Sequence, residues 1–244
     1  MKQLLIILAF LVSACSGEAD LRDYYYPIRD LTDGLIYEYE NTGNFEPAPY
    51  EYWYYLGIDQ DSALYLSSTR YAEATTPVQV TTDRVRNDGV YLQKLTLYPP
   101  DTGGVRQQVD ATILYDRVFP FYPDDERASG YRVRFVPPSN PDAESYVSLN
   151  RYYRGDTILE VMGDEVDAVV FDLKGEVSLR DQREGDISPT YTGYEIYAKN
   201  LGLVEYVRDL GAGGVAGGRL RRRLTMEEFL GGEPAAPPGQ DAAN

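Results

Sequence analysis

Short runs in which apolar and polar residues alternate fill most of the sequence, and turn-forming residues separate them. Alternation with a period of two is typical of half-buried strands. The pattern predicts an all-β protein with strands at residues 35–40, 50–58, 63–71, 78–85, 90–98, 105–118, 131–136, 145–153, 157–162, 171–180, 191–198, 203–209 and 220–224. Their length and spacing favour an antiparallel sheet, either a half-barrel or a barrel.

Turn chemistry refines this prediction. Residues 59–62 are expected to join two strands as a hairpin, and Asn87-Asp88-Gly89 is the strongest turn signal in the chain. Residues 154–156 are expected to divide two strands, and residues 211–218, with five glycines in eight positions, to form a loop. Thr225 and Glu228 have the spacing of a capping box. We therefore expect short helical pieces, including a final turn through Leu230.

The alternation is absent from the start of the chain. Lys2 precedes a continuous apolar run over residues 4–12, which ends in Val12-Ser13-Ala14-Cys15. A basic residue, a short apolar run and small residues describe a secretory signal peptide. Nine apolar residues are far fewer than the roughly 20 that span a bilayer. The predicted organisation is a lipoprotein signal peptide (1–14), a lipidated cysteine and tether (15–23), one β-rich domain (24–230) and a disordered tail (231–244).

The segment before Cys15 also resembles a bacterial lipobox: an aliphatic residue, two small residues and the cysteine that is lipidated, for instance with palmitate. One acyl chain anchors a protein only marginally, whereas two or three anchor it durably. Ser16 is not the aspartate that retains many such proteins at the inner membrane, so the resemblance implies an outer-membrane lipoprotein. The periplasmic and surface faces both stay open. A plainly cleaved signal with a free Cys15 is the competing interpretation.

Composition limits the chemistry. The chain has 23 basic and 39 acidic residues, a net charge of −16, no histidine and one cysteine. Such an acidic protein is a poor partner for nucleic acid. The lack of histidine excludes Ser-His-Asp and Cys-His nucleophile systems and the usual zinc sites. With a single cysteine, no disulfide can form within the chain.

A second resemblance lies near the C-terminus. Residues 194–204 read YEIYAKNLGLV, which is similar to a hairpin of uncharacterised bacterial envelope lipoproteins. Proteins with such hairpins often resemble the lipoprotein-carrier half-barrel, an incomplete antiparallel barrel around an apolar groove. The resemblance covers residues 166–224 and implies a binding protein without naming any functional residue.

Tyrosine, present 23 times, supplies the main candidate site. The candidate ligand-binding residues are Tyr50, Tyr52, Trp53, Tyr54 and Tyr55, and a second group at Tyr24, Tyr25 and Tyr26 stands near the start of the domain. Because tyrosine has an apolar body and a polar tip, these rings could stack on sugars or line a groove for acyl chains. The plainer interpretation is ordinary sheet packing.

Charged clusters give weaker candidates. Calcium needs six to eight oxygens, usually from one glycine-containing loop, and none of the acid clusters has that form. These clusters are Asp59 with Asp61, Asp124 with Asp125 and Glu126, and Asp164 with Glu165 and Asp167. Arginines at 219 and 221–223 form the only basic cluster, which we interpret as a charged solvent-facing or edge strand. We expect neither a metal nor a cofactor.

The sequence therefore predicts a lipid-anchored envelope protein of one domain and no catalytic residues. The leading function is a non-catalytic binding or assembly accessory for a hydrophobic ligand or an envelope component. The alternative is a surface lipoprotein that binds glycan or peptide through the tyrosines. An enzyme with paired carboxylates is a third hypothesis, which the many acids do not discriminate. Expected partners are the membrane, through Cys15, and such a ligand or envelope protein, but not nucleic acid.

Overall fold

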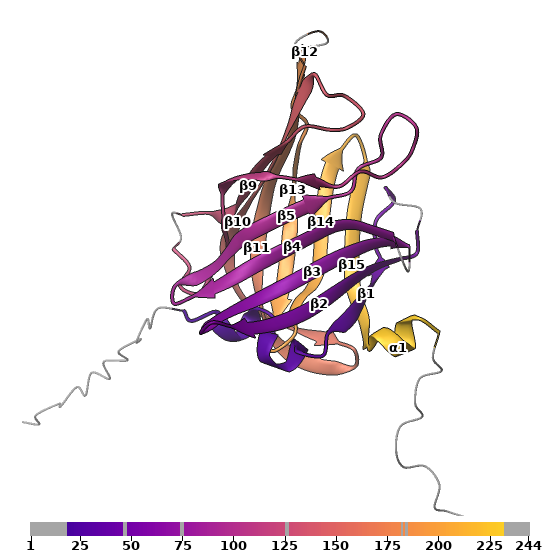
Figure 1. The fold of residues 1–244 in the computed structure, drawn as a ribbon. Helices are drawn as coiled ribbons and strands as arrows, with labels where there is room; N and C mark the ends of the chain where they lie inside the picture. The colour runs from indigo at the N-terminus through magenta and orange to yellow at the C-terminus, as the bar shows by residue number, and fades with distance from the viewer. Residues whose placement is uncertain are drawn as a thin grey trace, which may run out of the picture.

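The computed structural model describes residues 19–45, 48–73, 76–124, 127–181, 183 and 185–231. The predicted signal peptide and Cys15 lie outside these residues, as do residues 232–244, Asp125 and Glu126. The described chain forms a single antiparallel sheet of fifteen strands with three short helices (Figure 1). The predicted fold class, a barrel-like antiparallel sheet with short helical pieces, is confirmed.

The elements have the following bounds. The strands are β1 (Leu35–Asn41), β2 (Tyr50–Gln60), β3 (Ala63–Glu73), β4 (Thr76–Arg86), β5 (Gly89–Leu97), β6 (Val109–Asp110), β7 (Thr112–Tyr115), β8 (Arg117–Pro120), β9 (Ser129–Phe135), β10 (Ala143–Val161), β11 (Asp164–Asp181), β12 (Gly185–Ile187), β13 (Thr190–Ala198), β14 (Gly202–Gly211) and β15 (Gly214–Leu224). The helices are η1 (Arg22–Tyr24) and η2 (Ile28–Leu31), both 3-10 helices, and α1 (Met226–Phe229).

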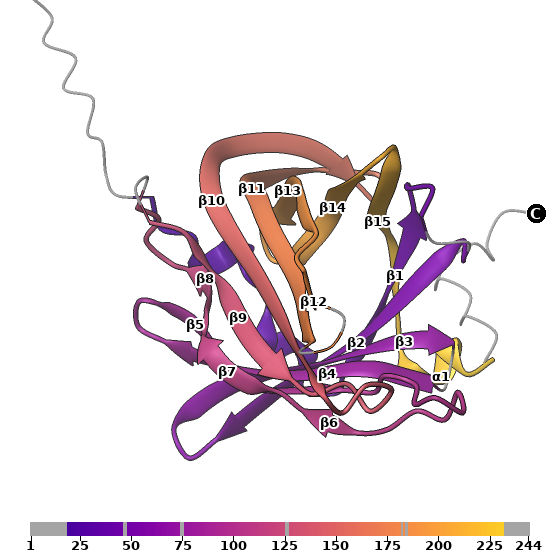
Figure 2. The same ribbon diagram turned by 90° about the horizontal axis from the view of Figure 1, so that it is seen from above.

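One segment of the chain links the two ends of the sheet, which is nearly closed into a barrel. Its strand order runs β6-β5-β4-β3-β2-β1-β15-β14-β13-β11-β10-β9-β7. The two end strands, β6 and β7, are consecutive in the chain. Residues 109–120 bond to β5 through β6 and β8, and to β9 through β7. Strands β1–β5 therefore lie on one side of a common axis and β10–β15 on the other, as Figure 2 shows from above.

The N-terminal segment closes one end of this barrel. Helices η1 and η2 lie beneath the strand ends in Figure 1, and Leu21, Ile28 and Leu31 are buried in the main core. Backbone hydrogen bonds tie the segment to distant loops, since the amide of Asn200 donates to the carbonyl of Asp23 at 2.7 Å. The folded body thus includes Leu21, a residue within the stretch that the sequence assigns to the tether.

Several predicted turns are confirmed. Asp61 and Ser62 adopt positive φ angles at the turn between β2 and β3, and β4 and β5 pair across the turn that precedes Gly89. The capping box also forms. The Thr225 hydroxyl accepts from the Glu228 amide at 3.2 Å, and the Glu228 carboxylate accepts from the Thr225 amide at 2.7 Å.

Three predicted boundaries are wrong. Residues 154–156 do not divide two strands, because β10 continues through them with a bulge between Tyr153 and Gly155. Residues 105–118 hold no single strand; the seam of the barrel breaks this region into β6, β7 and the start of β8. The predicted loop at 211–218 is strand from Gly214 onward. A Cβ at Gly218 would lie 2.7 Å from the Tyr206 ring, so glycine is required there by packing.

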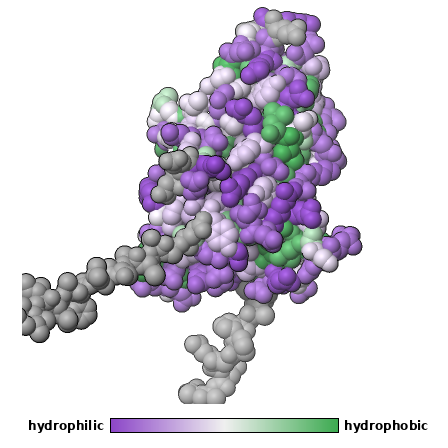
Figure 3. All heavy atoms as spheres, turned by 90° about the vertical axis from the view of Figure 1, so that its left-hand side faces the viewer, coloured by the Kyte–Doolittle hydropathy of each residue, from purple (hydrophilic) through white to green (hydrophobic). Residues whose placement is uncertain are grey.

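One face of the outer surface is largely polar. Figure 3 shows one face of the molecule as mostly hydrophilic, with small separate apolar patches. Among the described residues, no helix is long and apolar enough to cross a membrane.

Candidate ligand-binding cavity

The barrel encloses a cavity of about 180 Å³ that is partly open to solvent. Strands from both sides of the barrel contribute to it, because inward-facing side chains alternate with outward-facing ones along each strand. The aromatic lining residues are Tyr25, Tyr26, Trp53, Tyr55, Tyr131, Tyr197 and Tyr206. The charged lining residues are Glu51, Arg70, Asp83, Arg151, Glu195 and Arg208. The cavity is thus lined by aromatic rings and by charged side chains, of which three are acids and three are arginines.

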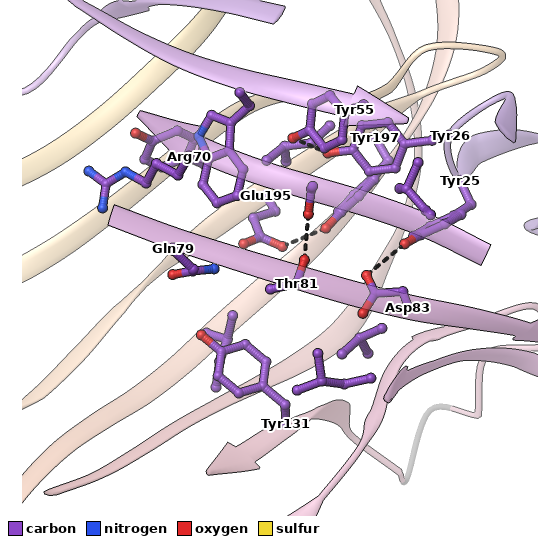
Figure 4. Close-up of a pocket in the computed structure, with 18 of the residues that line it drawn as sticks. Tyr25, Tyr26, Tyr55, Arg70, Gln79, Thr81, Asp83, Tyr131, Glu195 and Tyr197 are labelled. Carbon is purple, nitrogen blue, oxygen red and sulfur yellow. Dashed lines mark hydrogen bonds between the residues drawn. The ribbon is translucent and has the colours of Figure 1, made fainter. Parts of the chain in front are cut away.

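The floor of the cavity, next to the N-terminal segment, consists of Tyr25, Tyr26, Tyr55 and Asp83. The hydroxyl of Tyr25 donates to one Asp83 oxygen at 3.0 Å, and the hydroxyl of Tyr26 donates to that of Tyr55 at 2.8 Å. The rings of Tyr25 and Tyr26 meet edge to face with centroids 5.2 Å apart. Figure 4 shows these hydrogen bonds at the closed end of the cavity. The floor therefore consists of tyrosine hydroxyls that hydrogen bonds hold in place, together with the Asp83 carboxyl.

The wall contains a buried ion pair, the Glu195 network, formed by Glu195, Arg151, Tyr197 and Arg208. Glu195, on β13, is 1 % exposed. Arg151, on β10, donates to its two oxygens at 2.6 and 3.4 Å, and the Tyr197 hydroxyl donates at 3.0 Å. Arg208, on β14, comes no closer than 3.9 Å. The carboxylate is saturated by Arg151 and Tyr197, whereas Arg208 only neighbours it.

A second network is centred on Glu51, which lies four residues before Tyr55 on β2. The Glu51 carboxylate accepts from the Arg70 guanidinium at 2.8 Å and from the Trp53 indole at 2.5 Å. The Tyr206 hydroxyl donates to its other oxygen. Arg70 is 30 % exposed and Arg208 36 % exposed, against 10 % for Arg151. Arg70 and Arg208 therefore form the solvent-facing rim of the cavity.

The electrostatics of the cavity follow from burial and pairing. Burial raises the pKa of Asp83 to about 6, although the Tyr25 hydrogen bond and the charge of Arg151 act in the opposite direction. Burial would also raise the pKa of Glu195, but the charges of Arg151 and Arg208 and the hydrogen bonds from Arg151 and Tyr197 together outweigh it, and the pKa lies below its usual value. Burial raises the pKa values of Tyr25, Tyr26, Tyr55 and Tyr197. These phenols are neutral at physiological pH and can donate hydrogen bonds.

The structure divides the predicted tyrosine cluster between two faces of β2. Trp53 and Tyr55 point into the cavity, with their rings stacked at 6.2 Å. Tyr50 and Tyr52 lie on the outer face, where Arg221 stacks on Tyr50 and Phe229 of α1 packs against Tyr52. Tyr54 is also outside, its ring covering Gly34. Aromatic residues thus occupy both faces of β2, and no single exposed platform unites the five candidates.

The N-terminal tyrosines divide in the same way. Tyr25 and Tyr26 reach the cavity floor, whereas Tyr24 is absent from its lining.

The charged clusters lie away from the cavity. Asp59 pairs with Arg29 at 3.0 Å, and Asp61 occupies the adjacent turn. Asp124 pairs with Arg127 at 3.5 Å. Asp164, Glu165 and Asp167 are exposed on the β10–β11 hairpin. No group of three or more acidic, cysteine or histidine side chains suited to a metal ion occurs in the described part of the chain.

The arginine cluster is not at a sheet edge. Strand β15 lies between β1 and β14, and a bulge in its pairing with β1 brings Arg221 and Arg222 to the same outer face. Both donate to Glu38, at 2.9 Å from Arg221 and 3.0 Å from Arg222. Of the two interpretations, the edge strand is therefore wrong, whereas the solvent-facing strand is confirmed, because the arginines at 219 and 221–223 are exposed. We call Glu38, Arg221 and Arg222 the Glu38 clasp.

The sequence interpretation did not identify Arg70, Asp83, Tyr131, Arg151, Glu195, Tyr206 or Arg208. One signal was available for Glu195, which shares the inward face of β13 with Tyr197. A charge on a strand face that otherwise packs inward marks either a buried ion pair or a site.

Fold and cavity together define a class: a barrel-like antiparallel sheet with a polar, aromatic-lined cavity closed at one end. Comparison with known proteins gives two solved structures of similar fold. A "putative lipoprotein" of Parabacteroides distasonis has a TM-score of 0.50 and 13 % sequence identity, covering 82 % of this chain and 97 % of that one. A "putative exported protein with YmcC-like fold" of Bacteroides fragilis has a TM-score of 0.47 and 13 % identity, covering 78 % and 94 %. No family model and no curated protein matches the sequence.

Proposed function

We propose that this chain is a cell-envelope lipoprotein, anchored at Cys15 in the outer membrane, which binds a glycan without catalysing a reaction. The lipobox-like sequence that ends at Cys15 supports the anchor. The shared fold with a protein described as a lipoprotein is consistent with it. The lining of the barrel cavity is the single observation that carries the binding function.

The cavity chemistry supports a glycan better than a hydrophobic ligand. Aromatic rings provide faces for the C–H groups of a sugar, while arginines and carboxylates held in place by each other provide directed polar contacts. An acyl chain, which a lipoprotein carrier must hold, would meet aliphatic side chains such as Leu66, Leu92 and Leu149, but it would also bury methylenes against six charged side chains. The volume of about 180 Å³ is also below the roughly 300–1,000 Å³ of most ligand sites. It matches about one ring, since a cavity of about 150 Å³ admits benzene.

The state of most polar groups in the cavity supports binding rather than catalysis; the exception is Asp83, whose pKa of about 6 suits proton exchange. The buried tyrosines have raised pKa values and are poor nucleophiles or bases at neutral pH. Glu51 and Glu195 already accept hydrogen bonds from an arginine and from an aromatic side chain each. Carboxylates that accept hydrogen bonds in this way hold the neighbouring arginines and aromatic side chains in place, but they have little capacity to move a proton.

The anchor would set the orientation of the cavity. Ala19, the first described residue, is four residues beyond Cys15 and lies at the end of the barrel that the N-terminal segment closes. Four extended residues reach about 14 Å. A lipid on Cys15 would therefore hold the closed end near the membrane and leave the rim facing away from it, toward soluble or wall-bound glycans.

Binding can be tested with an array of bacterial mono- to tetrasaccharides, followed by calorimetry on the sugars retained. We expect Trp53→Ala to weaken binding about tenfold, because a well-placed aromatic contact contributes up to about 1.5 kcal/mol and about 1.4 kcal/mol is a factor of ten. Tyr50→Ala is the matched control, since Tyr50 belongs to the same strand but faces outward. Equal binding by both variants, or no sugar retained by the wild type, would contradict the proposal.

The anchor needs a separate test. Intact-mass spectrometry of the envelope fraction should show diacylglyceryl and fatty-acyl mass on Cys15. The Cys15→Ala variant should lack this mass and be released from the membrane. An unmodified Cys15 in the membrane-associated protein would remove the anchor from the proposal and leave the cavity argument unchanged.

A further inference from the structure

The Glu195 network contains two guanidinium groups and one carboxylate. Arg151 is fully engaged, with two hydrogen bonds to Glu195 and a third to the carbonyl of Val118 at 3.1 Å. Arg208 forms no hydrogen bond to any described residue, and its Nε is buried without a partner. A guanidinium has five N–H donors, so the network leaves one cation with its donors available.

The position of Arg208 makes these donors usable by a ligand. Its side chain lines the cavity at the rim and is 36 % exposed. The guanidinium lies 5.0 Å above the Tyr206 ring, and the hydroxyl of that tyrosine is held by Glu51. A guanidinium fixed against an aromatic plane presents its fork in one orientation, which suits a carboxylate that binds bidentately.

The size of the cavity limits what carries that carboxylate. About 180 Å³ accommodates roughly one ring, and Trp53, Tyr55 and Tyr131 supply aromatic surface in the same cavity as Arg208. Figure 4 shows Tyr55, Tyr131 and Glu195 approaching the same space from different strands. A single sugar ring with one carboxylate satisfies both the volume and the available cation.

We propose that the cavity selects an acidic sugar of the uronate type, whose carboxylate binds Arg208 while its ring lies against the aromatic wall. The inference rests on the proposed glycan-binding function and specifies its ligand class. It assigns Arg208 as the residue that determines specificity, and it leaves Arg151 and Glu195 as an ion pair that forms the adjacent wall.

The test is calorimetry on the full chain with four probes: sodium glucuronate, sodium galacturonate, glucose and galactose. We expect one uronate to bind at least about tenfold more tightly than its neutral counterpart, as one charge-assisted pair provides. Arg208→Gln should abolish this preference and keep the affinity for the neutral sugar. Arg222→Gln is the matched control, because Arg222 also pairs with a buried glutamate but on the outer face; it should keep the preference.

The outcomes separate the two proposals. Equal affinity for acidic and neutral sugars in the wild type would overturn the acidic-sugar inference and leave glycan binding standing. Binding of none of the four probes or of the wider sugar array would overturn both. Sodium acetate is a fifth probe, and acetate binding as tight as uronate binding would show an anion site with no role for the ring. Thermal unfolding of each variant verifies that it is folded.

Discussion

Two buried glutamates in this molecule are each flanked by two arginines, yet their surroundings differ. Glu38 and Glu195 are both 1 % exposed. In the Glu38 clasp both arginines donate hydrogen bonds, and their guanidiniums are about half exposed on the outer face. In the Glu195 network one arginine is buried and bonded while the other stands 3.9 Å away at the rim.

The difference shows how one type of ion pair can serve structure in one place and recognition in another. In the Glu38 clasp both arginines donate to the same carboxylate on the outer face of the barrel, away from the cavity. The Glu195 network is saturated on its carboxylate and unsaturated on one cation. Counting charges would treat the two sites as equal; counting hydrogen bonds distinguishes them.

Removal of Arg151 should have the largest effect. Arg151→Met leaves Glu195 buried without its main partner, which costs about 3–5 kcal/mol of unfolding free energy. Urea unfolding followed by the fluorescence of Trp53, the single tryptophan, measures this loss. The double variant with Glu195→Gln should recover a large part of it. A loss below about 1 kcal/mol would mean that the buried pair is not a structural unit.

Glu38→Gln tests the other site. Because Arg221 and Arg222 can return to water when their partner is neutralised, we expect a smaller loss of about 1–2 kcal/mol. The loss should shrink as salt is added, since half-exposed charges are screened. A loss as large as that of Arg151→Met, unaffected by salt, would remove the distinction between the two sites.

Asp83 is a third inward carboxylate, without an arginine hydrogen bond. Its pKa is raised from 3.8 to about 6, so the folded state holds a proton that the unfolded state has lost between these pH values. The stability from this group therefore falls as pH rises from about 4 to 6, and the cost is complete at pH 7. Asp83→Asn should stabilise the protein at pH 7.5 by up to about 3 kcal/mol, since a pKa difference of one corresponds to about 1.4 kcal/mol.

At pH 4 the same substitution should change little, because the carboxyl is then protonated in the folded protein and partly so in the unfolded one. Paired urea titrations at the two pH values provide the comparison. An identical gain at both would show that packing, not ionisation, is responsible.

Arg208→Gln should have the smallest effect on stability. Arg208 loses no hydrogen bond, and its ion pair at 3.9 Å is long, so the expected change is below about 1 kcal/mol. A thermal melt of this variant beside Arg222→Gln, which loses bonds to Glu38, should show the larger shift for Arg222. The reverse order would indicate that Arg208 has a structural role.

The sequence predicts the strands well where alternation and turn chemistry agree. Phe171 and Leu173 alternate with Asp172 and Lys174, and the structure buries the first pair while the second is more exposed. The glycines of β15 break this logic. Flexibility indicates a loop, but the ring of Tyr206 needs the space that Gly218 leaves. Only the pairing of distant strands makes that requirement visible.

The site was less predictable than the fold for a related reason. Alternation along β2 shows that Trp53 and Tyr55 share a face opposite Tyr52 and Tyr54, but it does not show which face points inward. The Glu195 network joins Arg151 to a residue 44 positions away, on a strand that is not its neighbour in the sheet. Such a contact depends on barrel curvature, which no local pattern encodes.

The pairing of the first strand with the last has a consequence for folding. Tyr37 of β1 donates to the carbonyl of Leu201, 164 residues later, and β1 pairs with β15. The barrel therefore cannot close while the chain is still being delivered from its N-terminus. The free edge of β1 stays unpaired until β15 has been synthesised. Contacts of such long sequence separation slow folding and prolong the exposure of aggregation-prone strand edges.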